Sequence, residues 1–554
     1  MAHTQGRTGG LGTRFAACPP AGMLTQEEPA LARGTRVLRP GLVGLSALVG
    51  TLLLIAGIAT SAATAAPRGS APLSGLANSG IDWKGCGEQL ECAKVRVPLD
   101  WDKPDGRKIK LAVIRHLASQ PEERIGSMFI NPGGPGASIA NVRDGGKALD
   151  TLTQGRFDIV TWDIRGSGKS AGVSCFKGER HRSRFWDRQP IPTTKRGARR
   201  YLPKTVAFAE RCGALNGGLL AHISTTDTVR DLDYLRRLVG DPELTFYGAS
   251  FGTFLGQTYA SMFPNRVRAM VLDGVVDPRA WTAGTEASIA SLRGDTDRVF
   301  EKFQSLCESV GPADCALAGH GSVARRVSRL LRRLRRGPLA APSASPPGRL
   351  TYGETLTAIT LALDTPAVWP RLAEDLEAAV DGDGSSLATR AGEGLADLYS
   401  VESEQTRAIV CADSPARQGP RAWPSAVDRL TDVSRIGGPP YAWWLWAACA
   451  SWPVHGADRY EGLWDAETKN PILVLGPRFD PSTPFGNARR VARRLGNAVL
   501  LAQDGYGHLS SADPSTCVRD AAGRYLVDLV TPPRGTVCPS DRVPFDPEFG
   551  EPIP

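Results

Sequence analysis

The pentapeptide 248–252, Gly-Ala-Ser-Phe-Gly, is the part of the chain whose residue types and spacing most clearly indicate chemistry. It follows a short apolar run, 244–247, and precedes a run of helical pattern, 254–260. A sharp turn from a strand into a helix strains the backbone of its central residue and exposes the side chain, and glycines two positions away on either side remove atoms that would collide. Ser250 is therefore a candidate nucleophile.

A serine nucleophile needs a base within hydrogen-bond reach and an acid that orients the base. Of the seven histidines, His508 lies just after the apolar run 498–502, where a loop after the last strand can bring an imidazole over the serine. Asp480 follows the apolar run 472–476, at the carboxyl end of an expected strand, where parallel sheets place functional groups. These two residues are the candidate base and acid.

The order of the three candidates along the chain supports their assignment. Ser250, Asp480 and His508 follow one another as nucleophile, acid and base, which is the order found in α/β-hydrolases. Asp273, at the end of another expected strand, and Asp504, in a turn before the histidine, are the alternative acids. This chemistry requires neither a metal nor a cofactor.

A tetrahedral intermediate at the serine also needs backbone N–H groups aimed at its developing negative charge. The N–H of Phe251, directly after the serine, is one expected donor. The second is expected from the glycine-rich loop 131–136, Asn-Pro-Gly-Gly-Pro-Gly, which follows the apolar run 127–130. Within this loop we expect Gly134 to be the donor, because a backbone without side chains can approach a substrate carbonyl.

The pattern of apolar runs predicts the architecture. Short apolar runs alternate with helical patterns over 67–278, which indicates a doubly wound α/β fold with a mostly parallel sheet. A helical, Arg- and Ala-rich segment, 279–465, interrupts this alternation, and strand patterns return in 466–554. We expect the interruption to be a helical lid over the site, inserted before the acid-bearing strand. An independent second domain is the alternative.

The beginning of the chain has the pattern of a secretory signal. The apolar stretch 41–63 follows three arginines and ends in small residues, so residues 1–66 are expected to be a signal peptide and leader that is removed. A retained membrane anchor is the alternative, and the start is Met1 or Met23. We expect a secreted or cell-envelope protein with no membrane span after cleavage.

The cysteine count agrees with export. Of eleven cysteines, Cys18 lies in the leader, and an even number in an exported chain favours disulfides. No Cys-x-x-Cys pair occurs, so a metal site is not expected. Because each pair falls within one expected segment, we predict that sequence neighbours are bonded: Cys86 with Cys92, Cys175 with Cys212, Cys307 with Cys315, Cys411 with Cys449, and Cys517 with Cys538.

The net charge of +9 is mild for 554 residues, but one run, 325–336, is strongly basic. Its apolar residues fall at helical spacing, so it is expected to be a solvated amphipathic helix. Binding to an anionic surface such as the cell envelope is the alternative interpretation. Nucleic acid is not an expected partner of an exported protein.

Taken together, these motifs resemble the secreted tripeptidyl aminopeptidase family of α/β-hydrolases, relatives of prolyl aminopeptidases. The resemblance covers nearly all of the mature chain, and its motifs are the segments 131–136, 163–170, 248–252, 272–275, 480–484 and 507–508. It implies an α/β-hydrolase fold and a serine exopeptidase that releases short peptides or single residues from peptide substrates with a free N-terminus. A carboxylesterase or lipase with the same triad, and a non-catalytic binding protein, are the alternatives.

An exopeptidase must recognise a free α-amino group, which calls for a carboxylate facing the site and a wall that stops longer chains. Within the expected lid, Asp413 is the first candidate for this carboxylate and Glu286 the second. The neighbouring tryptophans Trp443 and Trp444 are candidates for an apolar subsite, with buried packing as the alternative.

Overall fold

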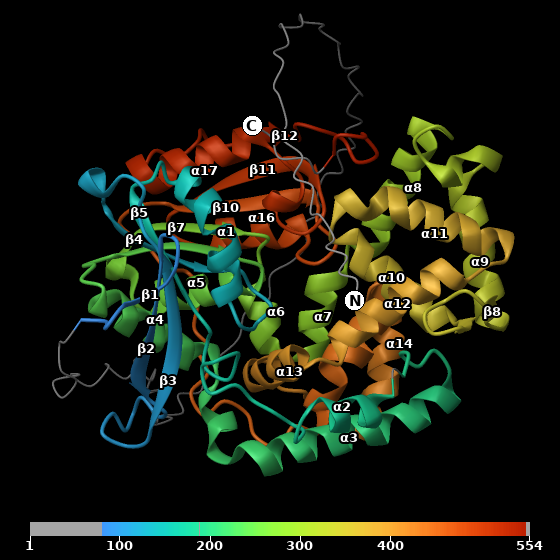
Figure 1. The fold of residues 1–554 in the computed structure, drawn as a ribbon, viewed down its shortest axis with the longest axis horizontal. Coiled ribbons are helices and arrows are strands. Elements are labelled where there is room, and N and C mark those ends of the chain that lie inside the picture. Colours follow the sequence, from blue (N-terminus) through green and yellow to red (C-terminus); the bar gives the residue numbers. More distant parts are fainter. Residues whose placement is uncertain (1–79, 188, 550–554) are drawn as a thin grey trace, which may run out of the picture. The chain divides into compact units, whose positions relative to one another are not determined.

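In the part of the chain that the structure describes, ten strands form one sheet in the order β1-β2-β3-β5-β4-β6-β7-β10-β11-β12 (Figure 1). This computed structural model describes residues 80–187 and 189–549, so the expected leader lies outside the described residues. The strands are β1 (Lys84–Gly87), β2 (Leu90–Pro98), β3 (Lys108–His116), β4 (Gly126–Asn131), β5 (Phe157–Trp162), β6 (Leu244–Ala249), β7 (Val267–Asp273), β10 (Ile472–Phe479), β11 (Ala498–Tyr506) and β12 (Val537–Pro539).

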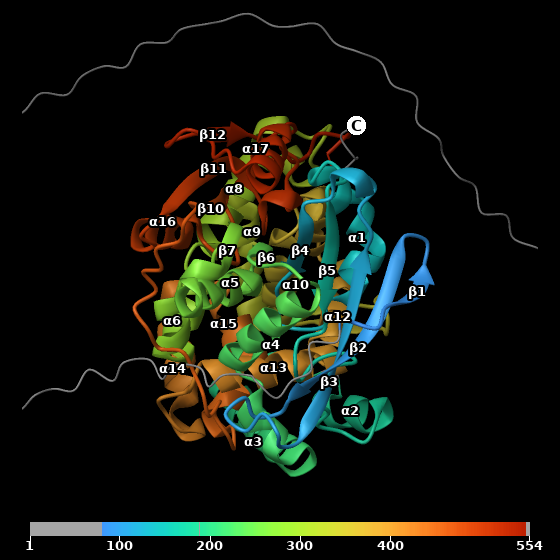
Figure 2. The same ribbon diagram turned by 90° about the vertical axis from the view of Figure 1, so that its left-hand side faces the viewer.

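The sheet is parallel from β5 to β12 and antiparallel among β1, β2, β3 and β5. All the apolar runs that the sequence indicates as strands lie in this sheet, and the short edge strands β1 and β12 add to them. The mostly parallel sheet expected from the sequence is therefore confirmed. Figure 2 shows the antiparallel strands β1–β3 at one edge of the sheet.

Alternation along the strands divides the core into two layers. In β10, Ile472 and Val474 pack on one face, and Leu473 and Leu475 pack on the other. The first face is covered by α4 (Thr225–Leu238), α5 (Phe251–Met262) and α16 (Phe485–Arg494), and the second by α1 (Ile139–Leu152) and α17 (Thr516–Asp528). Strands buried on both faces must be apolar throughout, which is why they read as continuous apolar runs.

The helical segment that the sequence predicts to be a lid connects β7 to β10. Its helices are α6 (Pro278–Ala283), α7 (Thr285–Arg293), α8 (Thr296–Val310), α9 (Val323–Arg336), α10 (Tyr352–Leu363), α11 (Trp369–Asp381), α12 (Ser385–Leu398), α13 (Val401–Asp413), α14 (Trp423–Val433) and α15 (Gly438–Tyr441), followed by the helical turns η7 (Ala442–Trp446) and η8 (Ala447–Ser451). The lid also holds a small hairpin, β8 (Leu339–Ala341) with β9 (Gly348–Leu350).

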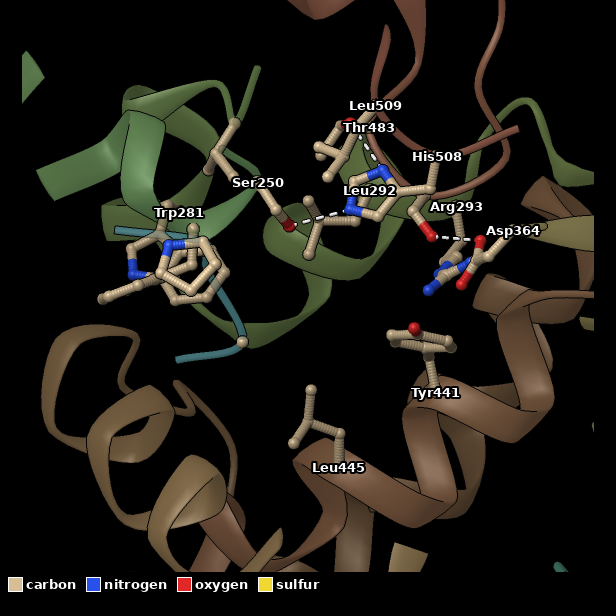
Figure 3. Close-up of a pocket in the computed structure, with 15 residues that line it drawn as sticks. Ser250, Trp281, Leu292, Arg293, Asp364, Tyr441, Leu445, Thr483, His508 and Leu509 are labelled. Atoms are coloured by element: carbon tan, nitrogen blue, oxygen red, sulfur yellow. Dashed lines mark hydrogen bonds and ion pairs between the residues drawn. The ribbon is translucent and has the colours of Figure 1, made fainter. Parts of the chain in front are cut away.

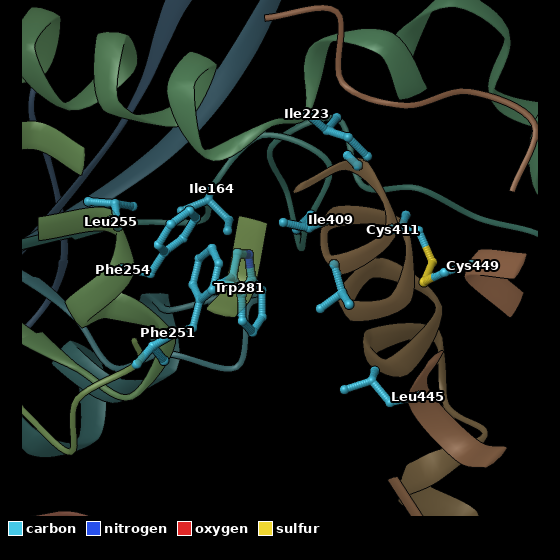
Figure 4. Packing of buried hydrophobic residues seen from close by; sticks show 14 of the residues in the cluster. Ile164, Ile223, Phe251, Phe254, Leu255, Trp281, Ile409, Cys411, Leu445 and Cys449 are labelled. Atoms are coloured by element: carbon cyan, nitrogen blue, oxygen red, sulfur yellow. A yellow bond between two sulfur atoms is a disulfide. The ribbon is translucent and has the colours of Figure 1, made fainter. Parts of the chain in front are cut away.

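The lid is joined to the sheet by a shared apolar core, although its outer helices have a core of their own. In Figure 4, Trp281 of α6 lies between Phe251 and Phe254 of α5 on one side and Ile409 of α13 on the other. The sheet and the lid belong to the same compact unit. Packing of this kind fixes lid residues relative to the residues at the strand ends.

A second excursion, between β5 and β6, packs against the lid. It contains α2 (Glu179–Trp186) and α3 (Lys195–Asn216). Arg182 of α2 and Glu404 of α13 form a buried ion pair, and the hydroxyls of Tyr201 and Tyr399 lie 3.0 Å apart. The lid is therefore held from two sides, by the sheet and by this excursion.

Within the described residues five disulfides are present, and they join the pairs expected from the sequence: Cys86–Cys92, Cys175–Cys212, Cys307–Cys315, Cys411–Cys449 and Cys517–Cys538. Cys411–Cys449 ties α13 to η8 within the lid (Figure 4). The basic run forms α9, in which Val323, Val327, Leu330 and Leu334 are buried while six arginines are exposed, as its amphipathic pattern predicts. Across residues 80–187 and 189–549, no helix has the length and apolarity needed to cross a bilayer.

Candidate active site

Ser250 stands at the turn between β6 and α5, with φ 53° and ψ −122°. A residue with a side chain rarely adopts this conformation, so the turn stores strain that the surrounding structure must offset. A Cβ atom at Gly248 would lie 2.4 Å from the carbonyl oxygen of Gly252, and one at Gly252 would lie 2.2 Å from that of Asn131. The two flanking glycines are therefore required by close backbone contacts, as the sequence pattern predicts.

A chain of hydrogen bonds joins Ser250, His508 and Asp480. The Nε2 atom of His508 lies 2.9 Å from Oγ of Ser250 (Figure 3). Its Nδ1 atom lies 3.1 and 3.2 Å from the two carboxylate oxygens of Asp480. The carboxyl ends of β6, β10 and β11 meet at one edge of the sheet because these strands are parallel. That edge brings together residues up to 258 positions apart.

The carboxylate of Asp480 is fully buried and firmly held. It accepts hydrogen bonds from the backbone N–H groups of Ser482 and Thr483, both at 2.7 Å, and from the Thr483 hydroxyl at 2.6 Å. Burial alone would raise the pKa of Asp480, but the charge and hydrogen bond of His508, together with the bonds from Thr483, hold it below the ordinary value of 3.8. Asp480 is thus kept ionised beside the imidazole.

Burial disfavours the protonated imidazole of His508, but the negative charge of Asp480 outweighs burial and raises the pKa of His508 above 6.5. Asp364 acts in the same direction, and Arg293 opposes it. A neutral imidazole that donates from Nδ1 to Asp480 leaves Nε2 able to accept the hydroxyl proton of Ser250. The arrangement can therefore activate the serine and stabilise the imidazolium that results.

Two residues that line the cavity beside Ser250, Phe251 and Gly134, carry backbone N–H groups. Among the described residues, neither Phe251 N–H, at the start of α5, nor Gly134 N–H has an acceptor. The N–H of Gly133 is instead bonded to Oδ1 of Asn131 at 3.1 Å. Phe251 and Gly134 can thus donate to an oxyanion, which is the geometry such a site needs.

Gly133 is a residue that the sequence interpretation missed. Its φ is 102°, and a Cβ atom there would lie 2.7 Å from Cβ of Ser250 and 3.1 Å from the backbone nitrogen of Phe251. The loop 131–136 therefore reaches the serine through Gly133 and presents Gly134 next to it. The sequence did carry a signal for Gly133, which is the pair of consecutive glycines 133 and 134. Only Gly134 was predicted to have a role at the site.

A cavity of about 250 Å³ surrounds Ser250 and His508. Its floor is formed by residues at the strand ends and its wall by the lid (Figure 3). Besides those two residues, the lining consists of Pro132, Gly134, Phe251, Val276, Trp281, Leu292, Arg293, Asp364, Tyr441, Leu445, Ser482, Thr483 and Leu509. No sequence motif pointed to Arg293, Asp364 or Tyr441, because helix packing rather than a local pattern brings them to the cavity.

Asp413, expected to face the substrate, does not line this cavity. Its buried carboxylate accepts hydrogen bonds from the backbone N–H of Thr225 at 2.8 Å and from the Thr225 hydroxyl at 2.6 Å, at the first turn of α4. Burial raises its pKa to about 7. Asp413 therefore joins α13 to α4 as a structural carboxyl group, and the expectation is corrected.

The other three expected substrate-binding residues also point elsewhere. Glu286 is paired with Arg429 on the surface, with bonds of 2.9 and 3.0 Å. Trp443 packs against Tyr201, and Trp444 donates from its indole nitrogen to a lid backbone carbonyl at 2.8 Å. The tryptophan segment does reach the cavity, but through Tyr441 and Leu445 on its opposite face.

The alternative acids do not contact the imidazole. The buried carboxylate of Asp273 accepts hydrogen bonds from the Tyr247 hydroxyl at 2.9 Å and from the hydroxyl and N–H of Ser510 at 2.8 and 3.0 Å. Asp504 lies 3.7 Å from Arg478 at the surface. Of the three candidates, Asp480 is the one bonded to His508.

Comparison with known proteins identifies the family of the chain. A family model described as alpha/beta hydrolase fold matches residues 126–310, and one described as TAP-like protein matches residues 438–538. The chain is 30% identical over 481 residues to serine protease Hip1 of Mycobacterium tuberculosis, covering 81% of this chain and 87% of that protein. It is 28% identical over 492 residues to tripeptidyl aminopeptidase of Streptomyces lividans, covering 84% and 88%.

The chain belongs to the tripeptidyl aminopeptidase family of α/β-hydrolases. Another relative, carboxylesterase B of Mycobacterium tuberculosis, is 30% identical over 531 residues, covering 91% of this chain and 98% of that protein. As a member of the tripeptidyl aminopeptidase family the protein is a hydrolase, and the family expected from the sequence motifs is confirmed.

Proposed function

We propose that the protein is an exported serine exopeptidase that releases short peptides or single residues from the N-terminus of peptide substrates. The observation that carries this proposal is the series of hydrogen bonds from Asp480 through His508 to Ser250 beneath a lid. The names of relatives, a serine protease and a tripeptidyl aminopeptidase, support peptides as substrates.

In the proposed mechanism, Ser250 Oγ attacks the scissile carbonyl while Nε2 of His508 takes the hydroxyl proton. The N–H groups of Gly134 and Phe251 bind the oxyanion, and Asp480 stabilises the imidazolium. The imidazolium then protonates the leaving amine, which departs and leaves an acyl-enzyme. Water, deprotonated by His508, attacks the ester, and Ser250 regains its proton as the peptide product is released.

We assign to the lid the restriction of cleavage to the end of a peptide chain. Trp281, Tyr441 and Leu445 wall the cavity on the side away from the sheet. A small roofed cavity can admit a chain end, whereas a continuous polypeptide would have to pass through the wall. Residues 279–465 are accordingly proposed as a lid insertion, between core segments 67–278 and 466–554.

Export is supported by the disulfides, because such bonds persist in oxidising compartments. We propose a secreted or envelope location, with residues 1–66 as the signal peptide and leader. Carboxylesterase activity is the second candidate function. It is favoured by the carboxylesterase B relative and by the fact that the triad does not determine the leaving group.

The proposal is tested with one peptide in two forms, with a free and with an acetylated N-terminus, beside a p-nitrophenyl ester. We expect the free peptide to be cleaved at least about 100-fold faster than the acetylated one, because loss of a charged contact at a buried site has an effect of this size. Equal cleavage of the two peptides would contradict the exopeptidase proposal. Turnover of the ester alone would favour the carboxylesterase.

A further inference from the structure

Arg293 is a buried guanidinium in the wall of the catalytic cavity. It is the last residue of α7, its side chain is 3% exposed, and it lines the cavity together with His508 (Figure 3). Burial holds its pKa below the ordinary value, although the charges of Asp364 and Asp480 act in the other direction. A positive charge in such a position needs strong acceptors to offset the loss of water.

The acceptors that the protein itself supplies to Arg293 are weak. Its Nη1 atom lies 3.4 Å from Oδ1 of Asp364 and 3.4 Å from the carbonyl oxygen of Pro481, both beyond the usual range of hydrogen bonds. Among the described residues its Nε and Nη2 atoms have no acceptor at all, and Nε is buried. A guanidinium has five N–H groups, so most of its capacity is unused.

Arg165, an equally buried arginine in the same chain, shows what full pairing looks like. Its Nε and Nη2 atoms bond to the carboxylate of Asp231 at 2.7 and 2.6 Å. Three backbone carbonyls accept its remaining bonds at 2.9 to 3.1 Å. Arg165 does not line the catalytic cavity, whereas Arg293 does. The incomplete pairing of Arg293 therefore coincides with a place where a ligand can complete it.

The surroundings of Arg293 hold its guanidinium in place. The ring of Tyr441 lies beneath it, 3.4 Å from ring centroid to guanidinium carbon. Asp364 is held in place by other contacts. Its carboxylate accepts a hydrogen bond from the Ser482 hydroxyl, and its backbone carbonyl accepts one from the backbone N–H of His508 at 2.8 Å. The guanidinium is thus preorganised, which lowers the entropic cost of binding a ligand.

Arg293 lies at one end of the cavity. Figure 3 shows Arg293 and Asp364 on the His508 side of Ser250 and Trp281 on the opposite side. Because the imidazolium delivers its proton to the leaving amine, the His508 side is where the leaving part of a substrate lies. The Trp281 side is left for the acyl part, where aromatic side chains offer an apolar surface.

We propose that Arg293 is a specificity-determining residue that binds a carboxylate on the leaving part of the substrate, so that the enzyme favours short peptides whose C-terminal carboxylate lies close to the scissile bond. The proposal rests on the proposed exopeptidase function and narrows its substrate class. A planar guanidinium matches a carboxylate with two parallel hydrogen bonds, which a lysine cannot reproduce.

The test compares alanine peptides with a C-terminal carboxylate and the same peptides as C-terminal amides, from four to eight residues long. For the wild type we expect the kcat/KM of the acid to exceed that of the amide about ten-fold or more for the shortest peptides, falling toward equality as the leaving part lengthens. In Arg293→Met the ratio should fall to about one, and in Arg293→Lys it should be intermediate.

The ratio of acid to amide is measured within one enzyme preparation, so it does not depend on how much of a variant is folded. Arg429→Met serves as the matched control, because Arg429 is an exposed lid arginine paired with Glu286 and does not line the cavity. Turnover of a neutral p-nitrophenyl ester should be similar in the wild type and in the control Arg429→Met.

Equal cleavage of acid and amide by the wild type, or a ratio that persists in Arg293→Met, would overturn the proposal while leaving the exopeptidase function intact. Cleavage of the ester without cleavage of any peptide would overturn both. A ratio lost equally in Arg429→Met would show a general effect of lid charge and would also overturn it.

Discussion

The three triad residues follow strands of the sheet, whereas six of the fifteen residues that line the cavity belong to the lid, and the two regions reach the cavity by different routes. Ser250, Asp480 and His508 follow the ends of three parallel strands, so the geometry of the sheet brings them together. Trp281 of α6 reaches the cavity because α6 packs against the core of the sheet, and Asp364 reaches it from the end of α10, which packs in the lid's own core. The comparison suggests that the sheet fixes the chemistry and that the lid selects the substrate.

Removing the nucleophile tests whether the residues on the sheet carry the chemistry, and it has the largest expected effect on turnover. Ser250→Ala should lower kcat by about 10⁴ to 10⁶, because the triad acts as a unit. The unfolding free energy should change by less than about 1 kcal/mol, since the hydroxyl contributes no packing to the core. Retention of substantial turnover, measured after removal of any contaminating wild-type enzyme, would contradict the assignment.

Replacing the acid, Asp480, should lower turnover slightly less than replacing Ser250. Asp480→Asn should lower turnover by about 10⁴, because it favours the wrong tautomer of the imidazole. The negative charge of Asp480 raises the pKa of His508, so its loss should move the acid limb of the pH–rate profile to lower pH. The rate of fluorophosphonate labelling against pH measures this shift.

Asp273→Asn is the matched control for Asp480→Asn, since both carboxylates are buried near the same strand ends. Asp273 contacts Ser510 and Tyr247 rather than His508, so we expect a loss of about ten-fold or less. A larger loss in Asp273→Asn than in Asp480→Asn would move the acid to Asp273.

Gly133→Ala should lower turnover by about 100-fold. The added methyl group would lie 2.7 Å from Cβ of Ser250 and would displace this residue. Small displacements of a nucleophile have effects of this size. Gly136→Ala, in the same loop, is the control, since a Cβ atom there meets nothing within 4 Å. Measured by kcat/KM with the ester, equal losses in both variants would indicate general disturbance of the loop instead.

Asp413→Asn has the smallest expected effect on catalysis and tests the corrected role of this residue. We expect unchanged discrimination between free and acetylated peptides, because Asp413 is bonded to Thr225 and does not line the cavity. If discrimination were lost, Asp413 would bind the substrate amine after all.

The same variant should alter the pH dependence of stability. In the folded protein the pKa of Asp413 is about 7, above the ordinary 3.8 expected on unfolding, so the folded state holds the extra proton between these values. The wild type therefore loses stability as pH rises from about 4 to about 7. Urea unfolding at pH 5 and pH 8 should show this loss reduced by on the order of 2 kcal/mol in Asp413→Asn, but not in the exposed control Asp504→Asn.

The difference between the two regions also explains what the sequence could predict. Strands at apolar runs, the turn at Ser250 and the loops that follow strands at Asp480 and His508 are local patterns, and parallel strands convert them into one site. The wall has no comparable pattern, because Tyr441 and Trp443 lie two residues apart in the same apolar run and face opposite sides. Which face meets the cavity depends on the packing of several helices.

Asp413 illustrates the same limit for charged residues. A carboxylate in a lid sequence can face a substrate or pair with a nearby backbone, and the sequence carries no information on which occurs. The structure pairs Asp413 with Thr225, 188 residues earlier. Arg293 gave no local signal either, since its significance depends on the acceptors it lacks in the folded chain.

The central claim, that Ser250 is the nucleophile activated by His508, is tested most directly by mapping the site of a fluorophosphonate label by mass spectrometry. We predict a single label per chain, on Ser250, formed in the wild type and at least about 10³-fold more slowly in His508→Ala. A label on a different residue, or labelling of Ser250 that is unchanged in His508→Ala, would contradict the account.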